Sequence, residues 1–411
     1  MDLEAPSFDD VRLARERLAG YVERTPVLAS ADLGRISGHE VVLKLENQQK
    51  TGAFKVRGAV AKLLAMAPAE RAEGVVTASA GNHGQGVALA ARLLDVPATV
   101  VLPVGAPLAK LAAIQRHAAE VVLEGTSYDE AHDYALRLAA EQGRAYVHAF
   151  DDPHVIAGQG SVALELLEDH PELDALVVPV GGGGLIAGVA IAARHVAPAL
   201  QIYGVQAAGS PALAEAFRTG SLGTGPANTI ADGIAVKAPS ARTFAVIQEY
   251  VRDVFTVEDE AIARAILLLL ERHKQLAEGA GAVALAAVLE GKLPATARRV
   301  GVIVSGGNID PILLGKVLQH GLASAGRYLA VRTWLEDQPG QLHALTGLLA
   351  EWHINILHVG IQRLGPHTAL GRVGLELIVE TRDRAHAHEV LARIREAGYP
   401  AEEALGLTPP S

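Results

Sequence analysis

The apolar positions of the chain change their spacing repeatedly, and this change predicts an alternation of strands and helices. Short apolar runs at 98–102, 175–180 and 300–304 are typical of buried strands. Elsewhere apolar residues recur every three or four positions, as they do from 258 to 273, which is typical of helices that bury one face. Strand, glycine turn, helix and next strand follow one another in this order, which favours parallel pairing with right-handed crossovers. We therefore expect an α/β fold.

Two changes in this pattern suggest the domain organisation. Residues from about 48 to 148 form one α/β block, which we expect to be a small subdomain inserted in a larger domain. From 328 onward the order becomes strand, helix, strand, strand, helix, which is typical of a ferredoxin-like α+β unit. We place a boundary near 325, which gives domains of residues 1–325 and 326–411.

The composition narrows the classes of partner. Of the 411 residues 50% are hydrophobic but only 4% aromatic, and the net charge of -10 offers no positive surface for nucleic acid or an acidic membrane. Cys is absent, which excludes disulfides, a thiolate nucleophile and Cys-bound metals. The start Met1–Glu4 is acidic, unlike a signal peptide, and the most apolar helix, at 261–270, is interrupted by Arg264. We expect a soluble cytoplasmic protein without nucleic-acid or membrane partners.

A run of four glycines is the strongest chemical signal. Gly181, Gly182, Gly183 and Gly184 stand between an expected strand and the start of a helix. Glycine lets the backbone approach an anion closely, and a helix N-terminus adds free N–H groups. A phosphate-binding turn is therefore a better interpretation of the four glycines than a merely flexible turn. A dinucleotide is disfavoured because the next strand ends at Gln206 instead of a ribose-binding carboxylate, and a P-loop lysine is missing. We expect a smaller phosphate cofactor.

Lys55 is the candidate nucleophile. It follows the turn residues Thr51 and Gly52 and begins a helix whose apolar positions include Val60 and Leu63. A lysine backed by an apolar face can be desolvated, which lowers its pKa and frees its neutral amine. Taken alone, such a lysine is more often an ordinary solvated one, and it is the other motifs of the chain that favour the nucleophile.

Two further turns follow strand ends, where ligands bind in open α/β sheets. Ser79–His83 precedes a helix and could hold a carboxylate, with Asn82 as a donor and His83 either in acid–base chemistry or in positioning the turn. Ser305 opens the turn Ser305–Asn308 and could offer its hydroxyl to a ligand nitrogen, although Ser and Gly are also common turn residues. A phosphate site, an amine and a carboxylate site together are what a pyridoxal phosphate enzyme acting on amino acids needs.

These motifs, in this order, resemble those of the threonine dehydratases (threonine ammonia-lyases), which have the tryptophan-synthase-β-like fold of pyridoxal phosphate enzymes, with two open twisted α/β subdomains. The resemblance covers about residues 5–320 and rests on four segments: Gly52–Ala59, Ser79–His83, Gly181–Gly188 and Ser305–Asn308.

The resemblance implies a role for each site residue. Lys55 would bind the cofactor covalently and later remove the Cα proton, and Phe54 would pack against the cofactor ring. Asn82 would contact the 3′-oxygen of the ring, and Ser305 would hydrogen-bond the ring nitrogen. The phosphate would be bound by Gly181, Gly182, Gly183 and Gly184. The substrate carboxylate would be held by Ser79, Ala80, Gly81, Asn82 and His83. The implied reaction converts L-threonine to 2-oxobutyrate and ammonia, and L-serine to pyruvate.

Several alternatives stay open. An L-serine or hydroxyaspartate dehydratase would carry the same motifs. Serine racemases of this fold have a second serine where this chain has Ala80 and a glutamate metal ligand where it has Gln206, so racemisation is a poorer prediction and no metal ligand is assigned, although a monovalent cation near Glu278 stays open. Outside this class stand an NAD-dependent oxidoreductase, which Gln206 disfavours, and a non-catalytic amino-acid sensor, which Lys55 and Ser305 disfavour.

The segment from Leu335 resembles a single ACT domain, a small amino-acid-sensing module. Asp337, Pro339 and Gly340 lie where such domains bind an effector, but they would equally suit a plain turn between a strand and a helix. The identity of an effector and a biosynthetic or catabolic role stay open. The fold group and the pairing of ACT domains lead us to expect a homodimer or homotetramer.

Overall fold

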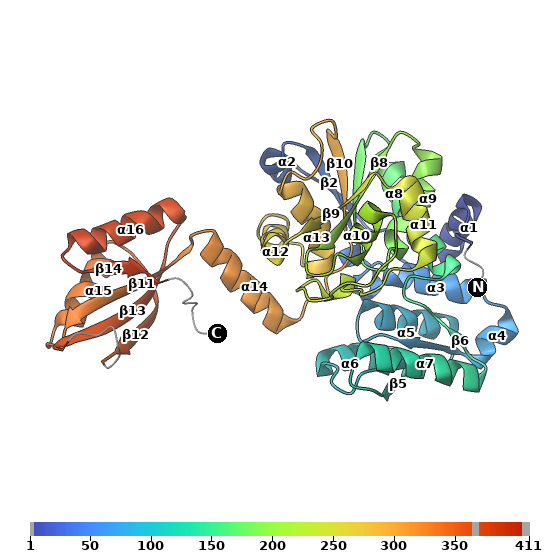
Figure 1. Cartoon of the computed structure of the whole chain (residues 1–411), viewed down its shortest axis with the longest axis horizontal. Coiled ribbons are helices and arrows are strands. Elements are labelled where there is room, and N and C mark those ends of the chain that lie inside the picture. Colours follow the sequence, from blue (N-terminus) through green and yellow to red (C-terminus); the bar gives the residue numbers. More distant parts are fainter. Residues whose placement is uncertain (1–3, 364–369, 405–411) are drawn as a thin grey trace. The chain divides into compact units, whose positions relative to one another are not determined.

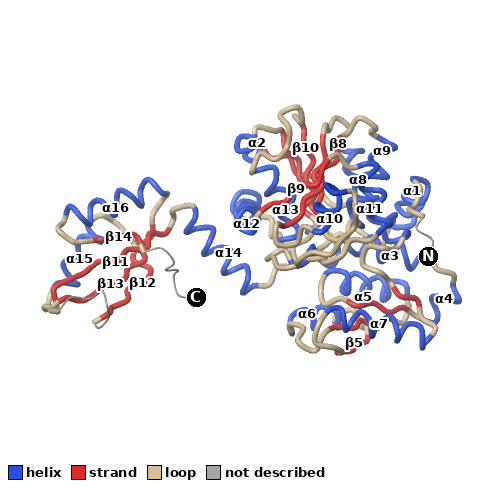
Figure 2. Tube along the Cα trace, in the orientation of Figure 1, coloured by secondary structure: helices blue, strands red, loops and turns tan. Residues whose placement is uncertain are grey.

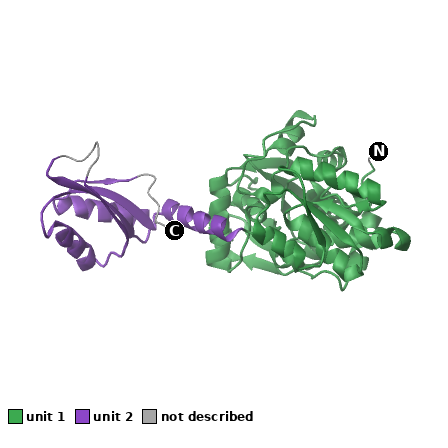
Figure 3. Ribbon diagram, turned by 90° about the horizontal axis from the view of Figure 1, so that it is seen from below, with its two compact units in different colours: residues 1–309 green, residues 310–411 purple. Residues whose placement is uncertain are grey.

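The computed structural model describes residues 4–363 and 370–404. The chain divides into two compact units, Met1–Ile309 and Asp310–Ser411, which Figure 3 colours separately. The predicted boundary near residue 325 falls at the end of helix α14 (Pro311–Ser324), which this division groups with the second unit.

A six-stranded sheet forms the centre of the first unit. Its strands lie in the order β1-β2-β10-β7-β8-β9, and all neighbours are parallel except β1 and β2. The bounds are β1 (Val27–Ser30), β2 (Glu40–Leu45), β7 (Ala175–Pro179), β8 (Gln201–Ala207), β9 (Asp253–Val257) and β10 (Arg299–Val304). The expected parallel α/β pattern is present, and Figure 2 shows helices around these strands.

A second, four-stranded parallel sheet has the order β5-β4-β3-β6. Its strands are β3 (Val75–Ala78), β4 (Ala98–Leu102), β5 (Glu120–Leu123) and β6 (Ala145–Tyr146). Helix α7 covers one face, where Ala131 and Ala135 pack with Val101, whereas α5 and α6 cover the other, where Ala88 and Ile114 pack with Val100 and Leu102 (Figure 1). Successive residues of β4 thus face different helices, as the alternation of a strand requires.

The helices of the first unit bury small apolar residues. Their bounds are α1 (Phe8–Leu18), α2 (Ala31–Ser37), α3 (Lys55–Ala65), α4 (Pro68–Glu73), α5 (Asn82–Leu94), α6 (Leu108–Gln115), α7 (Tyr128–Gln142), α8 (Pro153–Asp169), α9 (Gly184–Val196), α10 (Ala212–Thr219), α11 (Ala241–Tyr250), α12 (Asp259–His273) and α13 (Gly279–Leu289). In α13 all positions but the last are buried, which is expected of a helix that is apolar on every side. No helix in the described ranges is long and apolar enough to cross a membrane.

The second unit contains α14 and a four-stranded antiparallel sheet in the order β12-β13-β11-β14. Its elements are β11 (Tyr328–Glu336), α15 (Gln341–Glu351), β12 (Ile356–Gln362), β13 (Arg372–Glu380), α16 (Arg384–Glu396) and β14 (Ala401–Glu403). Leu345 of α15 and Val390 of α16 share one core with Val331 and Leu377 of the sheet. The predicted strand–helix–strand–strand–helix order is therefore present, with β14 as an additional edge strand.

Candidate active site

The segment that leads into Lys55 is attached to the end of strand β10. Ala53 pairs with Gly306 in an isolated bridge, and the Phe54 N–H donates to the Ser305 carbonyl at 3.1 Å. Helix α3 then begins at Lys55 itself. The chain thereby brings the predicted nucleophile beside the predicted serine turn, although about 250 residues separate them in sequence.

Lys55 faces the interior of the unit. Its Nζ donates to the carbonyl oxygen of Ala149 at 3.0 Å and lies 5.2 Å from the centre of the Phe54 ring. Burial lowers the pKa of Lys55 to about 8, and the negative charge of Glu278 opposes this decrease. A much larger fraction of Lys55 is therefore a neutral amine at physiological pH than for an exposed lysine, as the sequence predicted for a nucleophile.

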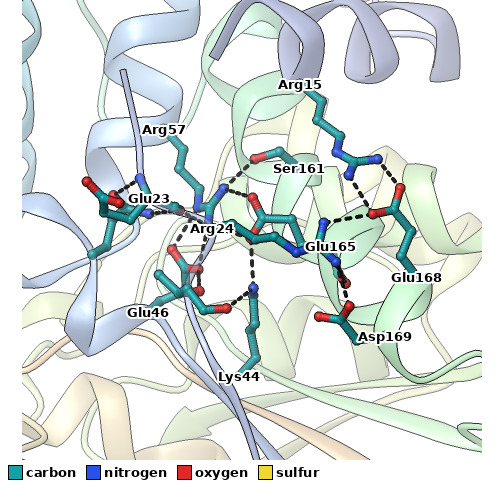
Figure 4. Close-up of polar contacts among 12 residues, drawn as sticks. Arg15, Glu23, Arg24, Lys44, Glu46, Arg57, Ser161, Glu165, Glu168 and Asp169 are labelled. Carbon is teal, nitrogen blue, oxygen red and sulfur yellow. Dashed lines mark hydrogen bonds and ion pairs between the residues drawn. The ribbon is translucent and has the colours of Figure 1, made fainter. Parts of the chain in front are cut away.

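A buried ion cluster contacts the first turn of α3 through Arg57. It consists of Lys44, Glu46, Arg57 and Glu165, drawn in Figure 4. The Arg57 guanidinium contacts Glu46 at 2.8 Å and Glu165 at 2.7 Å, and Lys44 contacts Glu165 at 2.7 Å. Burial opposes the charge of Arg57, but the two carboxylates together outweigh it and raise the pKa of Arg57, so the guanidinium stays charged. The cluster joins β2, α3 and α8, and so fixes the helix that carries Lys55.

The four glycines form the predicted turn from β7 into α9, and the packing accepts no other residue at its centre. Gly183 has a left-handed backbone with φ of 92°, and a Cβ there would lie 2.9 Å from Thr243 and Ile247. A Cβ on Gly182 would lie 2.4 Å from the Phe150 ring. Thr243 Oγ1 donates to the Gly182 carbonyl at 2.8 Å, which orients the turn. The N–H groups that open α9 have no partner within their own helix and can receive an anion.

Ser305 and Asn82 lie next to α13. Ser305 is 3% exposed, and its Oγ donates to the Ala280 carbonyl at 3.1 Å. Asn82 begins α5, and its Nδ2 donates to Glu278 Oε1 at 2.6 Å. A hydroxyl can rotate to a new partner, so Ser305 can serve a ring nitrogen as predicted.

The turn Ser79–His83 lies at the N-terminus of α5, where the sequence placed it. Ser79 Oγ accepts from the Gly81 N–H at 3.1 Å. His83 points into the protein, since it is 4% exposed and its Nε2 lies 2.9 Å from the Val147 carbonyl. Burial lowers the pKa of His83 to about 3, which leaves the imidazole neutral. This geometry favours the positioning role for His83 over acid–base chemistry.

Ala149 and Phe150 connect the lysine to the glycine turn. The carbonyl of Ala149 accepts from Lys55, and the ring of the next residue, Phe150, packs on Gly182. Sequence reasoning missed both, and also Thr243, because a carbonyl contact and a packing contact leave no local motif. The effector candidates Asp337, Pro339 and Gly340 belong to the second unit and are described with it below.

The side chain of Gln206 has a structural role, because it binds backbone N–H groups of helix α10. Its Oε1 accepts from the N–H groups of Leu213 at 3.0 Å and Ala214 at 2.8 Å, and so caps α10. Within residues 4–363 and 370–404, no group of three His, Cys, Asp or Glu side chains could hold a metal ion.

The first unit contains a turn that requires glycine, a half-buried amine and a buried hydroxyl, and these three groups fit pyridoxal phosphate. The model of the family "Pyridoxal-phosphate dependent enzyme" matches residues 18–306. The chain belongs to this family. It is a pyridoxal-phosphate-dependent enzyme, and the predicted tryptophan-synthase-β-like fold and cofactor are confirmed.

Similar proteins extend over nearly the whole chain. An L-threonine ammonia-lyase of Thermotoga maritima is 43% identical over 394 residues, which are 96% of this chain and 98% of that protein. One of Geobacter sulfurreducens is 42% identical over 390 residues, or 95% of this chain and 97% of that protein. Among solved structures, a threonine deaminase of T.th. is 40% identical with a TM-score of 0.70, covering 74% of this chain and 99% of that one. Maize serine racemase is 37% identical with a TM-score of 0.74, covering 78% and 99%.

Proposed function

We propose that the chain is an L-threonine ammonia-lyase that converts L-threonine to 2-oxobutyrate and ammonia and also accepts L-serine. The observation that carries the proposal is the half-buried Lys55, with its lowered pKa, at the start of α3 beside the serine turn of β10. The two relatives that match at least 95% of the chain carry the name of this activity.

The residues divide the work of elimination among them. Bound pyridoxal phosphate supplies an aldehyde that joins amines and a ring that withdraws electrons from the substrate Cα. The neutral amine of Lys55 is placed to take the Cα proton. The N–H groups at the start of α9 would hold the phosphate, and those at the start of α5, beside Ser79–His83, would hold the substrate carboxylate.

Ser305 supports elimination over other reactions of an amino acid. A neutral hydroxyl does not keep a ring nitrogen protonated as a carboxylate would, so less negative charge is drawn into the ring. Departure of the β-hydroxyl relieves that charge instead. Ala80 offers no group that could return a proton from the opposite face, which argues against racemisation despite the similarity to maize serine racemase.

A substrate comparison tests the proposal. Purified full-length enzyme with pyridoxal phosphate is given L-threonine, L-serine and L-threo-3-hydroxyaspartate separately, and the 2-oxo acid, ammonia and D-serine are measured. The proposal expects the highest kcat/KM with L-threonine, lower turnover of L-serine and no D-serine. A higher kcat/KM for L-serine or hydroxyaspartate would favour one of the dehydratases left open by the sequence, and D-serine formation would favour a racemase.

We propose an ACT-like regulatory role for the second unit, with Asp337, Pro339 and Gly340 at an amino-acid effector site. Gly340 has φ of 94° and precedes α15, and Arg363 holds both oxygens of Asp337 at 2.7 and 2.9 Å. A separate hollow of about 520 Å³ in this unit is lined by Trp334, Tyr399 and five neighbours. Added isoleucine, valine or threonine should change activity in the wild type and not in Asp337→Ala if the turn is the effector site.

The assembly is also part of the proposal, which is a cytoplasmic homodimer or homotetramer. Strand β12 is the edge of its sheet, and it exposes Leu357, Val359 and Ile361 to 39%, 39% and 52%. An apolar edge strand is a template for pairing with a second copy of itself. Light scattering should give the protein a mass two or four times that of a single chain, and Val359→Lys should lower this mass.

A further inference from the structure

Glu278 is a buried carboxylate that the roles proposed so far do not use. It is 4% exposed and stands immediately before α13, but its side chain makes no hydrogen bond to that helix. An acidic residue at this position ordinarily caps the helix that follows. The Glu278 carboxylate is directed elsewhere, toward the start of α5.

The carboxylate ends a hydrogen-bond chain whose direction is fixed. Asn308 Nδ2 donates to the Thr51 carbonyl at 2.6 Å and to Asn82 Oδ1 at 2.8 Å, and Asn82 Nδ2 donates to Glu278 at 2.6 Å. A carbonyl can only accept, so Asn308 presents its nitrogen, and Asn82 must then turn its oxygen to Asn308 and its nitrogen to Glu278. The second N–H of Asn82 remains a donor for the cofactor.

Gly306 brings this carboxylate close to the segment that carries Lys55. The Glu278 N–H donates to the Gly306 carbonyl at 3.1 Å, and Gly306 pairs with Ala53. A Cβ on Gly306 would lie 2.3 Å from Glu278 Oε1 and 3.2 Å from the Ala53 Cβ. Glu278 and the approach to Lys55 therefore pack on the same glycine, with no room for a side chain between them.

The two groups also influence each other's charge. Glu278 raises the pKa of Lys55 against the effect of burial, and burial with the charge of Asp232 raises the pKa of Glu278 to about 7, which Asn82, Lys110 and Lys55 oppose. The imidazoles of His83 and His148 also respond to Lys55, and burial lowers their pKa values to about 3 and about 4. Both are neutral near pH 7, so they add no positive charge that would repel a protonated Lys55.

We propose that Glu278 is a positioning and charge-balancing residue of the active site, which orients Asn82 and supplies the negative charge beside which Lys55 accepts a proton. The inference rests on the proposed lyase function. In the step concerned, the Cα–H bond breaks, its electron pair stays on the substrate and the proton passes to Nζ of Lys55. Glu278 gains and loses nothing in this step, and it stabilises the ammonium that forms.

The test is made on cofactor-free protein, so that it does not depend on catalysis. The rate of Lys55 acetylation by acetic anhydride is followed by mass spectrometry from pH 6 to 10 in the wild type, Glu278→Gln and Glu290→Gln. Glu290 follows the other end of α13, so its variant removes an equal charge from the same helix far from Lys55. We expect the midpoint for Lys55 to fall by about one pH unit in Glu278→Gln, and not to move in Glu290→Gln. An unchanged midpoint in folded Glu278→Gln would overturn the proposal.

Two more variants separate charge from orientation. Asn308→Ala removes the partner of Asn82 and leaves every charge in place, so it should weaken pyridoxal phosphate binding without moving the Lys55 midpoint. Glu278→Asp keeps the charge, so its Lys55 midpoint should stay near that of the wild type. This variant keeps the charge role testable if Glu278→Gln does not fold. The charge role is contradicted if the Lys55 midpoint moves as far in Asn308→Ala as in Glu278→Gln, or if it falls as far in Glu278→Asp as in Glu278→Gln. Failure to form 2-oxobutyrate from threonine in the wild type would instead count against the proposed function.

Discussion

At the scale of single residues, the most local signals were the most informative. The glycine run and the helix-entrance lysine could be predicted because each lies within a few consecutive residues, and the structure joins both to Ala149–Phe150. Glu278 entered the sequence analysis only as a residue near which a monovalent cation could bind. Its contact with Asn82 spans 196 positions, and no local pattern encodes such a pair. The burial that lowers the pKa of Lys55 likewise comes from the whole unit.

The lowered pKa of Lys55 makes stability depend on pH in a defined direction. Its folded pKa of about 8 lies below the ordinary value of 10.5, so the folded chain binds fewer protons than the unfolded chain between these values. Holding a buried lysine destabilises the cofactor-free protein fully below pH 8, and this cost disappears as the pH rises toward 10.5. Lys55→Met should therefore raise the unfolding temperature of the cofactor-free protein at pH 7, and the gain should shrink from pH 8 to 10. A gain that grows with pH would show that the sign is wrong.

Two glycines with left-handed backbones separate strain from function. Gly183 has φ of 92° and crowded surroundings, whereas Gly220 has φ of 76° and no atom within 4 Å of the place that a Cβ would take. Alanine at Gly220 should cost about 1 kcal/mol of unfolding free energy because of the backbone, and alanine at Gly183 should cost more because its Cβ also meets Thr243 and Ile247. Only Gly183→Ala should also weaken pyridoxal phosphate binding, measured by fluorescence titration. Equal affinities in the two variants would contradict the phosphate role of the turn.

At the scale of elements, the long periodic helices and central strands could be predicted, as could the short strands β5 and β6, whereas several other short elements could not. Strands β1, β9 and β14 have four, five and three residues and lie at sheet edges, so their identity depends on pairing with a neighbour. The helices α2, α4 and α10 have eight residues or fewer, which is too short for a clear period. The charges at Lys44 and Glu46, in and after an otherwise apolar strand, were an unread signal of the buried ion cluster.

The buried ion cluster should matter far more than the exposed one beside it. Arg57→Met leaves Glu46 and Glu165 buried with one cation fewer, which should cost about 3–5 kcal/mol in urea unfolding. Arg24→Gln breaks pairs with Glu168 and Asp169 that are 41–47% exposed, and should cost about 1 kcal/mol or less. Similar losses in the two variants would mean that the cluster does not anchor α3.

Gln206 predicts how the enzyme responds to metal removal. Its oxygen caps α10, and the position carries no charge to hold a divalent cation. Full activity should persist after dialysis against EDTA, with no gain from added Mg²⁺. Activity that is lost with EDTA and restored by Mg²⁺ would require a metal ligand set different from the one the described residues offer.

At the scale of the whole molecule, the change of pattern after about residue 320 separated an α/β part from an α+β part, and the structure contains both. The family model ends at residue 306, while the relatives from Thermotoga maritima and Geobacter sulfurreducens match at least 95% of the chain. How the second unit acts on the first could not be predicted, because effector sites and pairing depend on surfaces between copies. Each contact described for Lys55, Asn82 and Ser305 lies within the first unit.

The most direct measurement is the absorbance spectrum of the protein with pyridoxal phosphate, before and after addition of L-threonine, in the wild type, Lys55→Ala and the control variant Lys292→Ala. Lys292 follows α13, and its side chain is 42% exposed. We predict an absorbance band at the violet end of the visible spectrum for the lysine-bound cofactor in the wild type and in Lys292→Ala. This band should change when threonine is added, and 2-oxobutyrate should accumulate. Lys55→Ala should lack the band. A protein that stays colourless, or a Lys55→Ala variant that keeps the band, would contradict the assignment of Lys55 as the cofactor-binding residue.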